Sequence, residues 1–145
     1  MKSKHNRQEL SYYGLLLLSY LQESHPDKTN DLQFIKNRAD IAAETYSNAI
    51  KDGSSHDRAE EIACKALYSG LLFSKFDTIR NILFEEFSYI PESEVFQKAM
   101  SLLPYCEEVF AEYTLYDEFA YSAEYNRLYT ELVGLIDMWE DEHEL

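Results

Sequence analysis

Glycine and proline are scarce in this sequence, with four and three copies in 145 residues. An all-β fold of this length needs many tight turns, and turns draw heavily on these two residues. Their scarcity therefore favours helices. A chain of this length fits one domain and buries about 68 to 70% of its unfolded surface, which is enough for a core without disulfides or metals.

Cysteine is equally rare, with Cys64 and Cys106 as the two copies. They lie far apart in the sequence, neither has a CxxC neighbour, and the chain is large enough to fold without a bridge. Cys106 falls on an apolar stripe with Leu103, Val109 and Phe110, which favours a buried and inert side chain. We therefore expect two reduced thiols in a cytoplasmic protein.

Basic residues are few relative to acidic ones: 13 lysines and arginines face 27 aspartates and glutamates, which gives a formal charge of −14. Such a charge repels DNA, RNA and anionic membrane surfaces, so we expect no direct nucleic-acid binding. The charge can instead keep a small domain soluble and monomeric, which we favour, or it can attract a basic partner.

Long hydrophobic runs are also missing. The apolar stretch from Tyr12 to Leu21 follows three basic residues, Lys2, Lys4 and Arg7, and so resembles a secretory signal. Glu9 interrupts the approach to this stretch, however, and no cleavage site of small residues follows it. Because a bilayer-spanning helix needs about 20 apolar residues, we expect no membrane segment.

The spacing of apolar residues predicts an all-α fold, a compact single-domain bundle of about six to seven helices. We expect residues 1–145 to form this one helical domain, with 1–7 and 140–145 frayed. Asn30, Ser74 and either Ser54 or Ser55 are the expected helix caps, and Pro104 is expected to break or kink a helix. Helices are expected over about 8–23, 30–52, 55–73, 74–87, 91–113 and 122–139, with an irregular segment over 114–121.

The stretch from residue 59 to 87 is expected to form the centre of the fold, as two helices joined at Ser74. Small residues recur at helical spacing in its first half and bulky ones in its second, so the two stripes can interdigitate. Ser74 followed by Asp77 indicates a helix start, and hence a short join. The small stripe comprises Ala59, Ala63, Ala66 and Gly70, and the bulky stripe Phe76, Ile79, Leu83 and Phe87.

No local pattern indicates catalysis, a metal site or a cofactor. The histidines show no i, i+4 pair that would place two imidazoles on one helical face. Glu140-Asp141-Glu142-His143 has the Glu-x-x-His spacing of di-iron bundles, but only once. Phosphate-binding loops and GxSxG turns are absent from the sequence. We therefore predict no catalytic, metal or cofactor-binding residues; the four histidines are His5, His25, His56 and His143.

Tyrosines and acids alternate from Tyr105 to Tyr129. Tyrosine combines apolar area with a polar tip, which suits recognition surfaces, but several of these rings could equally be core. Within the expected irregular segment, Tyr116, Phe119 and Tyr121 are predicted to be the most exposed. The candidate protein-binding residues are Tyr113, Tyr116, Asp117, Glu118, Phe119, Tyr121 and Tyr125.

An ordered run of short motifs spans almost the whole chain, including Leu17-Leu18-Ser19-Tyr20-Leu21, Ser24-His25-Pro26, Leu67-Tyr68-Ser69-Gly70-Leu71 and Leu128-Tyr129-Thr130-Glu131-Leu132. In this order the motifs resemble a family of uncharacterised Bacteroidetes proteins, a domain of unknown function often carried on conjugative transposons. The resemblance implies a single helical domain in a bacterial cytoplasm. It carries over no catalytic residue.

The leading hypothesis is a small non-enzymatic accessory protein that binds another protein, possibly basic in charge, through the Tyr-rich acidic segment. The alternative is an acidic mimic of nucleic acid that inhibits a DNA-binding enzyme, suggested by the charge of −14 and the implied mobile-element setting. A hydrolase or metal enzyme would need a cleft lined by perturbed carboxylates or histidines. We expect a monomer or a homodimer.

Overall fold

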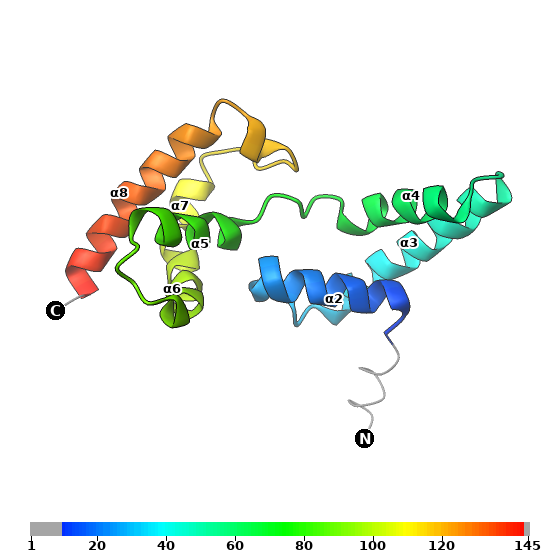
Figure 1. Ribbon diagram of the computed structural model, residues 1–145, viewed down its shortest axis with the longest axis horizontal. Coiled ribbons are helices and arrows are strands. Elements are labelled where there is room, and N and C mark those ends of the chain that lie inside the picture. Colours follow the sequence, from blue (N-terminus) through cyan, green and yellow to red (C-terminus); the bar gives the residue numbers. More distant parts are fainter. Residues whose placement is uncertain (1–9, 144–145) are drawn as a thin grey trace, which may run out of the picture. The chain divides into compact units, whose positions relative to one another are not determined.

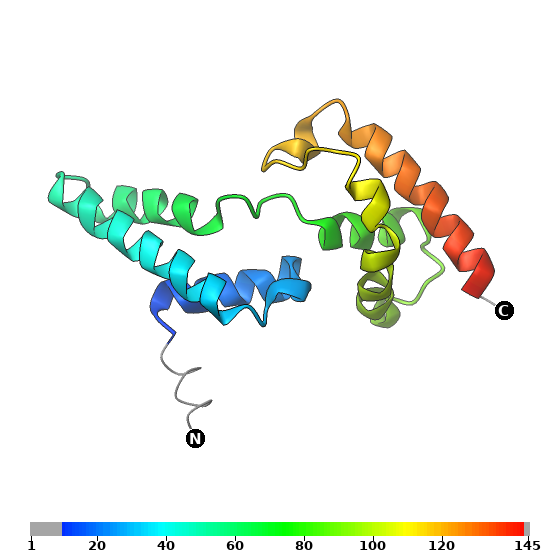
Figure 2. The ribbon, with the colours of Figure 1, turned by 180° about the vertical axis from the view of Figure 1, so that it is seen from behind.

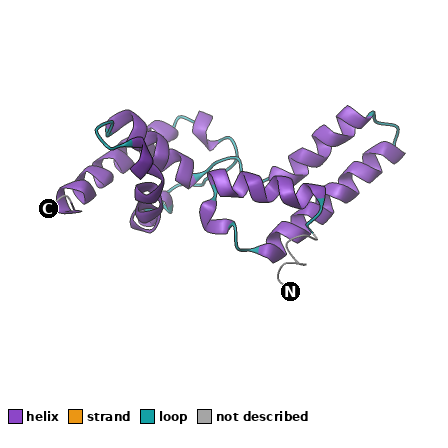
Figure 3. Ribbon diagram, turned by 60° about the horizontal axis from the view of Figure 1, so that its bottom comes forward, coloured by secondary structure: helices purple, strands orange, loops and turns teal. Residues whose placement is uncertain are grey.

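The structure is a computed structural model that describes residues 10–143. Between these residues the chain forms seven α-helices and two short 3-10 helices, with no strand (Figure 1 and, coloured by secondary structure, Figure 3). The all-α prediction is therefore confirmed. In chain order the elements are α2 (Tyr12–Ser24), η1 (Pro26–Lys28), α3 (Leu32–Lys51), α4 (His56–Tyr68), α5 (Lys75–Glu86), α6 (Glu92–Tyr105), α7 (Glu107–Phe110), η2 (Phe119–Tyr121) and α8 (Tyr125–His143).

The helices group into two compact units, which we call unit 1 (Met1–Ser69) and unit 2 (Gly70–Leu145). Unit 1 contains α2, η1, α3 and α4, and unit 2 contains the remaining helices. That residues 1–145 fold as one domain stays a prediction. The expected fraying of residues 1–7 concerns a segment outside the described residues.

Unit 1 is built on a hairpin of α3 and α4, which run side by side, with α2 packed mainly against α3 (Figure 2). The helix starts follow from side-chain caps: Asp31 accepts from the amide of Phe34, and Ser55 from that of Arg58, at 3.1 and 3.2 Å. Ser55 is one of the two predicted caps, whereas Asp31 replaces the predicted Asn30. The buried residues shared by the hairpin are small or medium in size: Ile35, Ala39, Ala42, Ala59, Ala63 and Leu67.

The C-terminal end of α4 is closed by an arginine from α3. The guanidinium of Arg38 donates to the carbonyls of Ser69, Leu67 and Ala66 at 2.6, 3.1 and 3.4 Å. The last carbonyls of a helix have no partner within it, so this side chain satisfies groups that would otherwise need water. Gly70 follows with φ at +81°, a conformation that favours glycine.

The predicted pairing of the two halves of the 59–87 stretch is wrong. Its first half is α4, whose small stripe faces α3 in unit 1, and its second half is α5, which packs against α6 in unit 2. The join is also longer than predicted, because residues 69–74 separate the two helices. Ser74 does cap α5 as expected, since its hydroxyl accepts from the amide of Asp77 at 2.9 Å.

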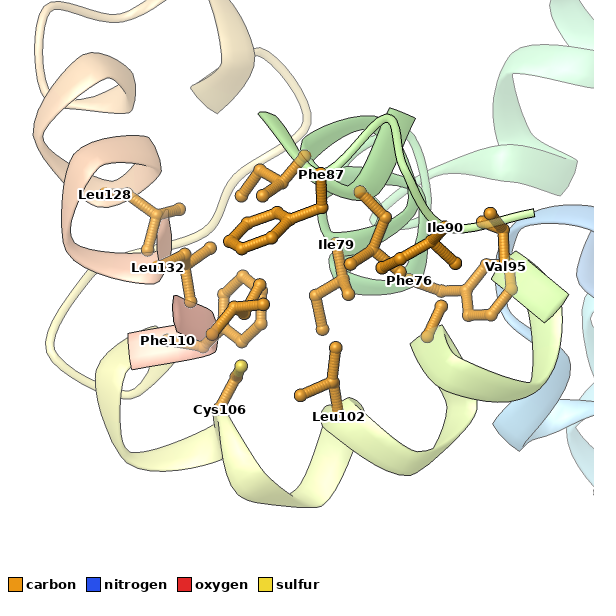
Figure 4. Packing of buried hydrophobic residues seen from close by; sticks show 14 of the residues in the cluster. Phe76, Ile79, Phe87, Ile90, Val95, Leu102, Cys106, Phe110, Leu128 and Leu132 are labelled. Atoms are coloured by element: carbon orange, nitrogen blue, oxygen red, sulfur yellow. The ribbon is translucent and has the colours of Figure 1, made fainter. Parts of the chain in front are cut away.

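Unit 2 has a core of large side chains from α5, α6, α7 and α8. Figure 4 shows Phe76 and Ile79 from α5, Leu102 from α6, and Leu128 and Leu132 from α8 converging on one another. Cys106 and Phe110 are 0% exposed in the same cluster, as the apolar stripe predicted for Cys106. Burial raises the pKa of the Cys106 thiol to about 12, so the group is a neutral part of the core.

Helix α6 ends at Tyr105, one residue after Pro104, and α7 begins at Glu107. The helix is therefore interrupted close to the proline, but at Cys106; Pro104 lies inside α6 and, contrary to the prediction, does not restart a helix. Residues 140–143, part of the segment 140–145 for which fraying is predicted, belong to α8, which ends at His143. Glu140 is only 4% exposed, and it accepts from Lys98 Nζ at 2.9 Å and from the Tyr89 hydroxyl at 3.1 Å.

Candidate functional site

The candidate segment lies between α7 and α8 and is irregular, as the sequence predicts, apart from the short helix η2. Backbone bonds fold η2 tightly: the amide of Phe119 donates to the carbonyl of Tyr116, and that of Tyr121 to Glu118, each at 2.9 Å. The Ser122 hydroxyl donates to the carbonyl of Phe119 at 2.7 Å and closes the turn. The segment is therefore held by its own hydrogen bonds.

Phe119 is the centre of the segment and is 0% exposed, so the prediction that it is among the most exposed residues is wrong. Its ring meets those of Phe73, Tyr113, Tyr116 and Tyr125 edge to face, with centroid separations of 5.3, 5.8, 6.0 and 6.4 Å. Such contacts add to the stabilisation that comes from burying the ring, so Phe119 anchors the loop to the core of unit 2.

Asp117 holds a second chain segment against the loop. Its carboxylate accepts from the amide of Gly70 at 2.9 Å and from that of Leu72 at 3.1 Å. The backbone at Leu72 is therefore held beside the loop, and Leu72 is 56% exposed. Sequence reasoning missed Leu72, because the contact joins residues 45 positions apart and leaves no local pattern.

Several tyrosines of the segment have structural roles. The hydroxyl of Tyr113 donates to Glu131, and this hydrogen bond, with some desolvation, raises the pKa of Tyr113 to about 12. The hydroxyl of Tyr129 donates to Glu85 and Glu86 at 2.7 and 3.0 Å. Burial raises the pKa of the Tyr125 hydroxyl above its usual value. These rings link α8 to its neighbours.

What the folded segment presents to solvent is a smaller set of residues. Tyr121 is 91% exposed and Tyr116 48%, as predicted for both. Glu118 and Glu124 are exposed beside them in sequence. We call Leu72, Tyr116, Glu118, Tyr121 and Glu124 the aromatic loop surface. Of the seven residues predicted for protein binding, it retains three, because Tyr113, Asp117, Phe119 and Tyr125 make the internal contacts that support it.

The charge of the chain is concentrated in unit 2. Residues 70–145 contain 17 acidic and four basic residues, a formal charge of −13, whereas residues 1–69 contain 10 and nine, a charge of −1. Three of the four basic residues already pair with carboxylates of unit 2, at N–O distances of 2.7 to 2.9 Å. The aromatic loop surface therefore lies in a strongly negative field.

Other features of the described residues offer little chemistry. Between residues 10 and 143, no three histidine, cysteine or acidic side chains are grouped so that they could hold a metal ion. A pocket of about 190 Å³ in unit 1 is lined by Leu10, Ser11, Lys36, Ala39 and Asp40, and it is smaller than the roughly 300 Å³ at which ligand pockets begin. No helix within the described part of the chain is long and apolar enough to cross a membrane.

Comparison with known proteins finds a similar solved structure and a matching family model. The solved structure of protein PG0816 from Porphyromonas gingivalis is similar to this chain with a TM-score of 0.87 and 38% sequence identity, covering 98% of this chain and 97% of that one. No curated protein matches the sequence. A family model described as a domain of unknown function, DUF1896, matches residues 5–145. The chain therefore belongs to the DUF1896 family.

Proposed function

We propose that this chain is a non-enzymatic protein that binds another protein through the aromatic loop surface of unit 2. The observation that carries the proposal is Tyr121, a large ring that is 91% exposed at the end of a tightly hydrogen-bonded turn. Its neighbour Phe119 anchors the turn in the core. An aromatic side chain on a fixed backbone loses little conformational entropy on binding, which is typical of interface hot spots.

The charges around this ring support a basic partner. Glu118 and Glu124 are exposed, and unit 2 as a whole has a charge of −13. A basic surface would be drawn toward unit 2 from a distance, and Leu72 and Tyr116 would add apolar contact area. The predicted cytoplasmic location and mobile-element setting remain part of this proposal.

The test is affinity capture from a lysate of the organism that encodes the chain. Wild type, Tyr121→Ala and a Tyr116→Ala/Tyr121→Ala double variant serve as baits, with retained proteins identified by mass spectrometry. Ile41→Ala is the control, because Ile41 is 53% exposed but lies in unit 1. We expect a partner that the control retains and the double variant loses. Equal retention by all baits would contradict the proposal.

A second function, inhibition of a DNA-binding enzyme by mimicry of nucleic acid, is favoured by the charge alone. In such a mimic, the carboxylates spaced across unit 2 would take the place of DNA phosphates. Its binding to the enzyme would then weaken steeply as the salt concentration rises. The distinguishing measurement is competition: a short DNA duplex should displace a mimic from its captured partner. A partner that DNA does not displace, and that requires Tyr121, would favour the first function.

A further inference from the structure

A second surface, independent of the proposed function, lies on α2 in unit 1. Residues 10–22 contain no charged side chain, although 28% of the whole chain is charged. One side of α2 is buried within unit 1 through Tyr13, Leu17 and Leu21. The other side presents Tyr12 at 61% exposure and Leu15 at 54%.

The outward row of α2 continues along the helix at the spacing of a single face. Ser19 is exposed four positions after Leu15, and Leu16 is half-buried between them. The ring of Tyr12 rests edge-on against that of Tyr13, with centroids 5.2 Å apart, which restricts its motion. The result is an apolar row, ended by Ser19, on the uncharged stretch 10–22 of α2, with Glu23 as the charged residue near the C-terminal end of the helix.

The distribution of charge indicates which kind of partner can pack against this row of α2. An uncharged face gives no electrostatic advantage to a basic or an acidic partner. Association of two copies through unit 2 would bring −13 against −13, whereas association through unit 1 brings −1 against −1. The face of α2 therefore adds no like-charge repulsion of its own when a second copy packs against it.

The row is also complementary to itself. In a symmetric dimer each residue meets a defined counterpart, and an antiparallel pair of helices with its two-fold axis between Leu15 and Leu16 places Leu15 opposite Leu16 of the second copy. The same axis places Tyr12 opposite Ser19 of the second copy. A bulky ring then faces a small side chain at both ends, which is the arrangement that close helix packing requires.

We propose that the outward row of α2, comprising Tyr12, Leu15, Leu16 and Ser19, is a homodimer interface in which two copies of α2 pack antiparallel. The helix has 13 residues and is about 20 Å long, so the contact is smaller than the roughly 800 Å² per partner of a standard interface. A contact of this size is typical of weak, reversible association.

Sedimentation equilibrium of the full chain tests this proposal. Between about 1 and about 500 µM protein, the weight-average mass of the wild type should rise from 17.0 kDa toward twice that value. Leu15→Glu places a charge at the centre of the interface and should raise the dissociation constant at least tenfold. Ile41→Glu is the matched control, because Ile41 is 53% exposed on α3 and acquires the same charge.

Ser19→Glu is a second variant, directed at the ends of the interface, and circular dichroism verifies that each variant is folded. We expect both α2 variants to weaken the dimer and the control to leave it unchanged. A wild type that keeps a mass of 17.0 kDa throughout the range would overturn the proposal. So would a dimer that neither α2 variant weakens, or one that Ile41→Glu weakens equally.

Discussion

The two units pack their helices together through buried side chains of different size. In unit 1, α3 and α4 meet through four buried alanines, Ala39, Ala42, Ala59 and Ala63, whereas unit 2 fills its interior with Phe76, Phe110, Phe119 and branched aliphatic residues. Small side chains let helices approach closely, and large ones provide area from a more open arrangement. Substitution of a buried residue by a larger one should therefore destabilise unit 1, and substitution by a smaller one should destabilise unit 2.

The largest expected effect follows from truncation in unit 2. Phe119→Ala removes a fully buried ring that four other aromatic rings contact, so it should lower the free energy of unfolding by about 3 to 5 kcal/mol. Chemical denaturation followed by circular dichroism measures this change. Phe34→Ala is a useful comparison, because Phe34 is only half-buried in unit 1. A loss below about 1 kcal/mol for Phe119→Ala would mean that the loop does not depend on this ring.

Enlargement in unit 1 should have the next largest effect. Ala63 is 0% exposed between α3 and α4, so Ala63→Leu must push the helices apart at a cost of about 1 to 3 kcal/mol. The control is Ala43→Leu on the exposed side of α3, which should leave stability almost unchanged. Equal stability of the two variants in denaturant titrations would show that the hairpin is not closely packed.

Glycine substitutions should act in opposite directions in the two units. Gly53 ends α3 with φ at +96°, so Gly53→Ala should destabilise the protein by about 1 kcal/mol. Gly134 lies within α8, and a methyl group added there would meet no atom within 4 Å, so Gly134→Ala should stabilise by about 1 kcal/mol. Melting temperatures of the two variants provide the measurement, and shifts of the same sign would contradict this assignment.

The two cysteines allow the units to be compared by the reactivity of their thiols rather than by stability. Burial raises the pKa of both thiols, that of Cys106 to about 12, while Cys64 in unit 1 is only half-buried. A thiol-specific reagent at about pH 8 should therefore modify Cys64 first and Cys106 only as the protein unfolds. Cys64→Ser and Cys106→Ser assign the two phases. Faster reaction of Cys106 would mean that the core of unit 2 opens readily.

The sequence predicts those features that depend on local spacing. Helical periodicity and the caps Ser55 and Ser74 arise from residues within a few positions of one another, and the structure contains both. The partner of α4 could not be predicted in this way, because a stripe of alanines accepts any helix of suitable shape. Its actual neighbour, α3, precedes it in the chain.

The candidate site was predicted only in part, for the same physical reason. The irregular segment has no periodicity from which burial can be inferred, so Phe119 and the exposed Tyr121 looked alike. The bonds of Asp117 to Gly70 and Leu72 join distant positions and are invisible in local sequence. The burial of Glu140 was not predicted, because the side chains of an acidic tail are normally solvated. In the structure, hydrogen bonds from Lys98 and Tyr89 compensate the cost of burying its carboxylate.

We propose that the aromatic loop surface of unit 2 holds a basic protein partner. The most direct measurement is the affinity of the captured partner for two charge-reversal variants of the full chain. Glu118→Lys/Glu124→Lys reverses two exposed acids on the aromatic loop surface, and Asp40→Lys/Glu44→Lys reverses two exposed acids on α3 of unit 1 with the same change in net charge. We predict that the affinity for the partner falls at least tenfold for the first variant and changes little for the second. Equal losses for both variants, or none for the first, would contradict it.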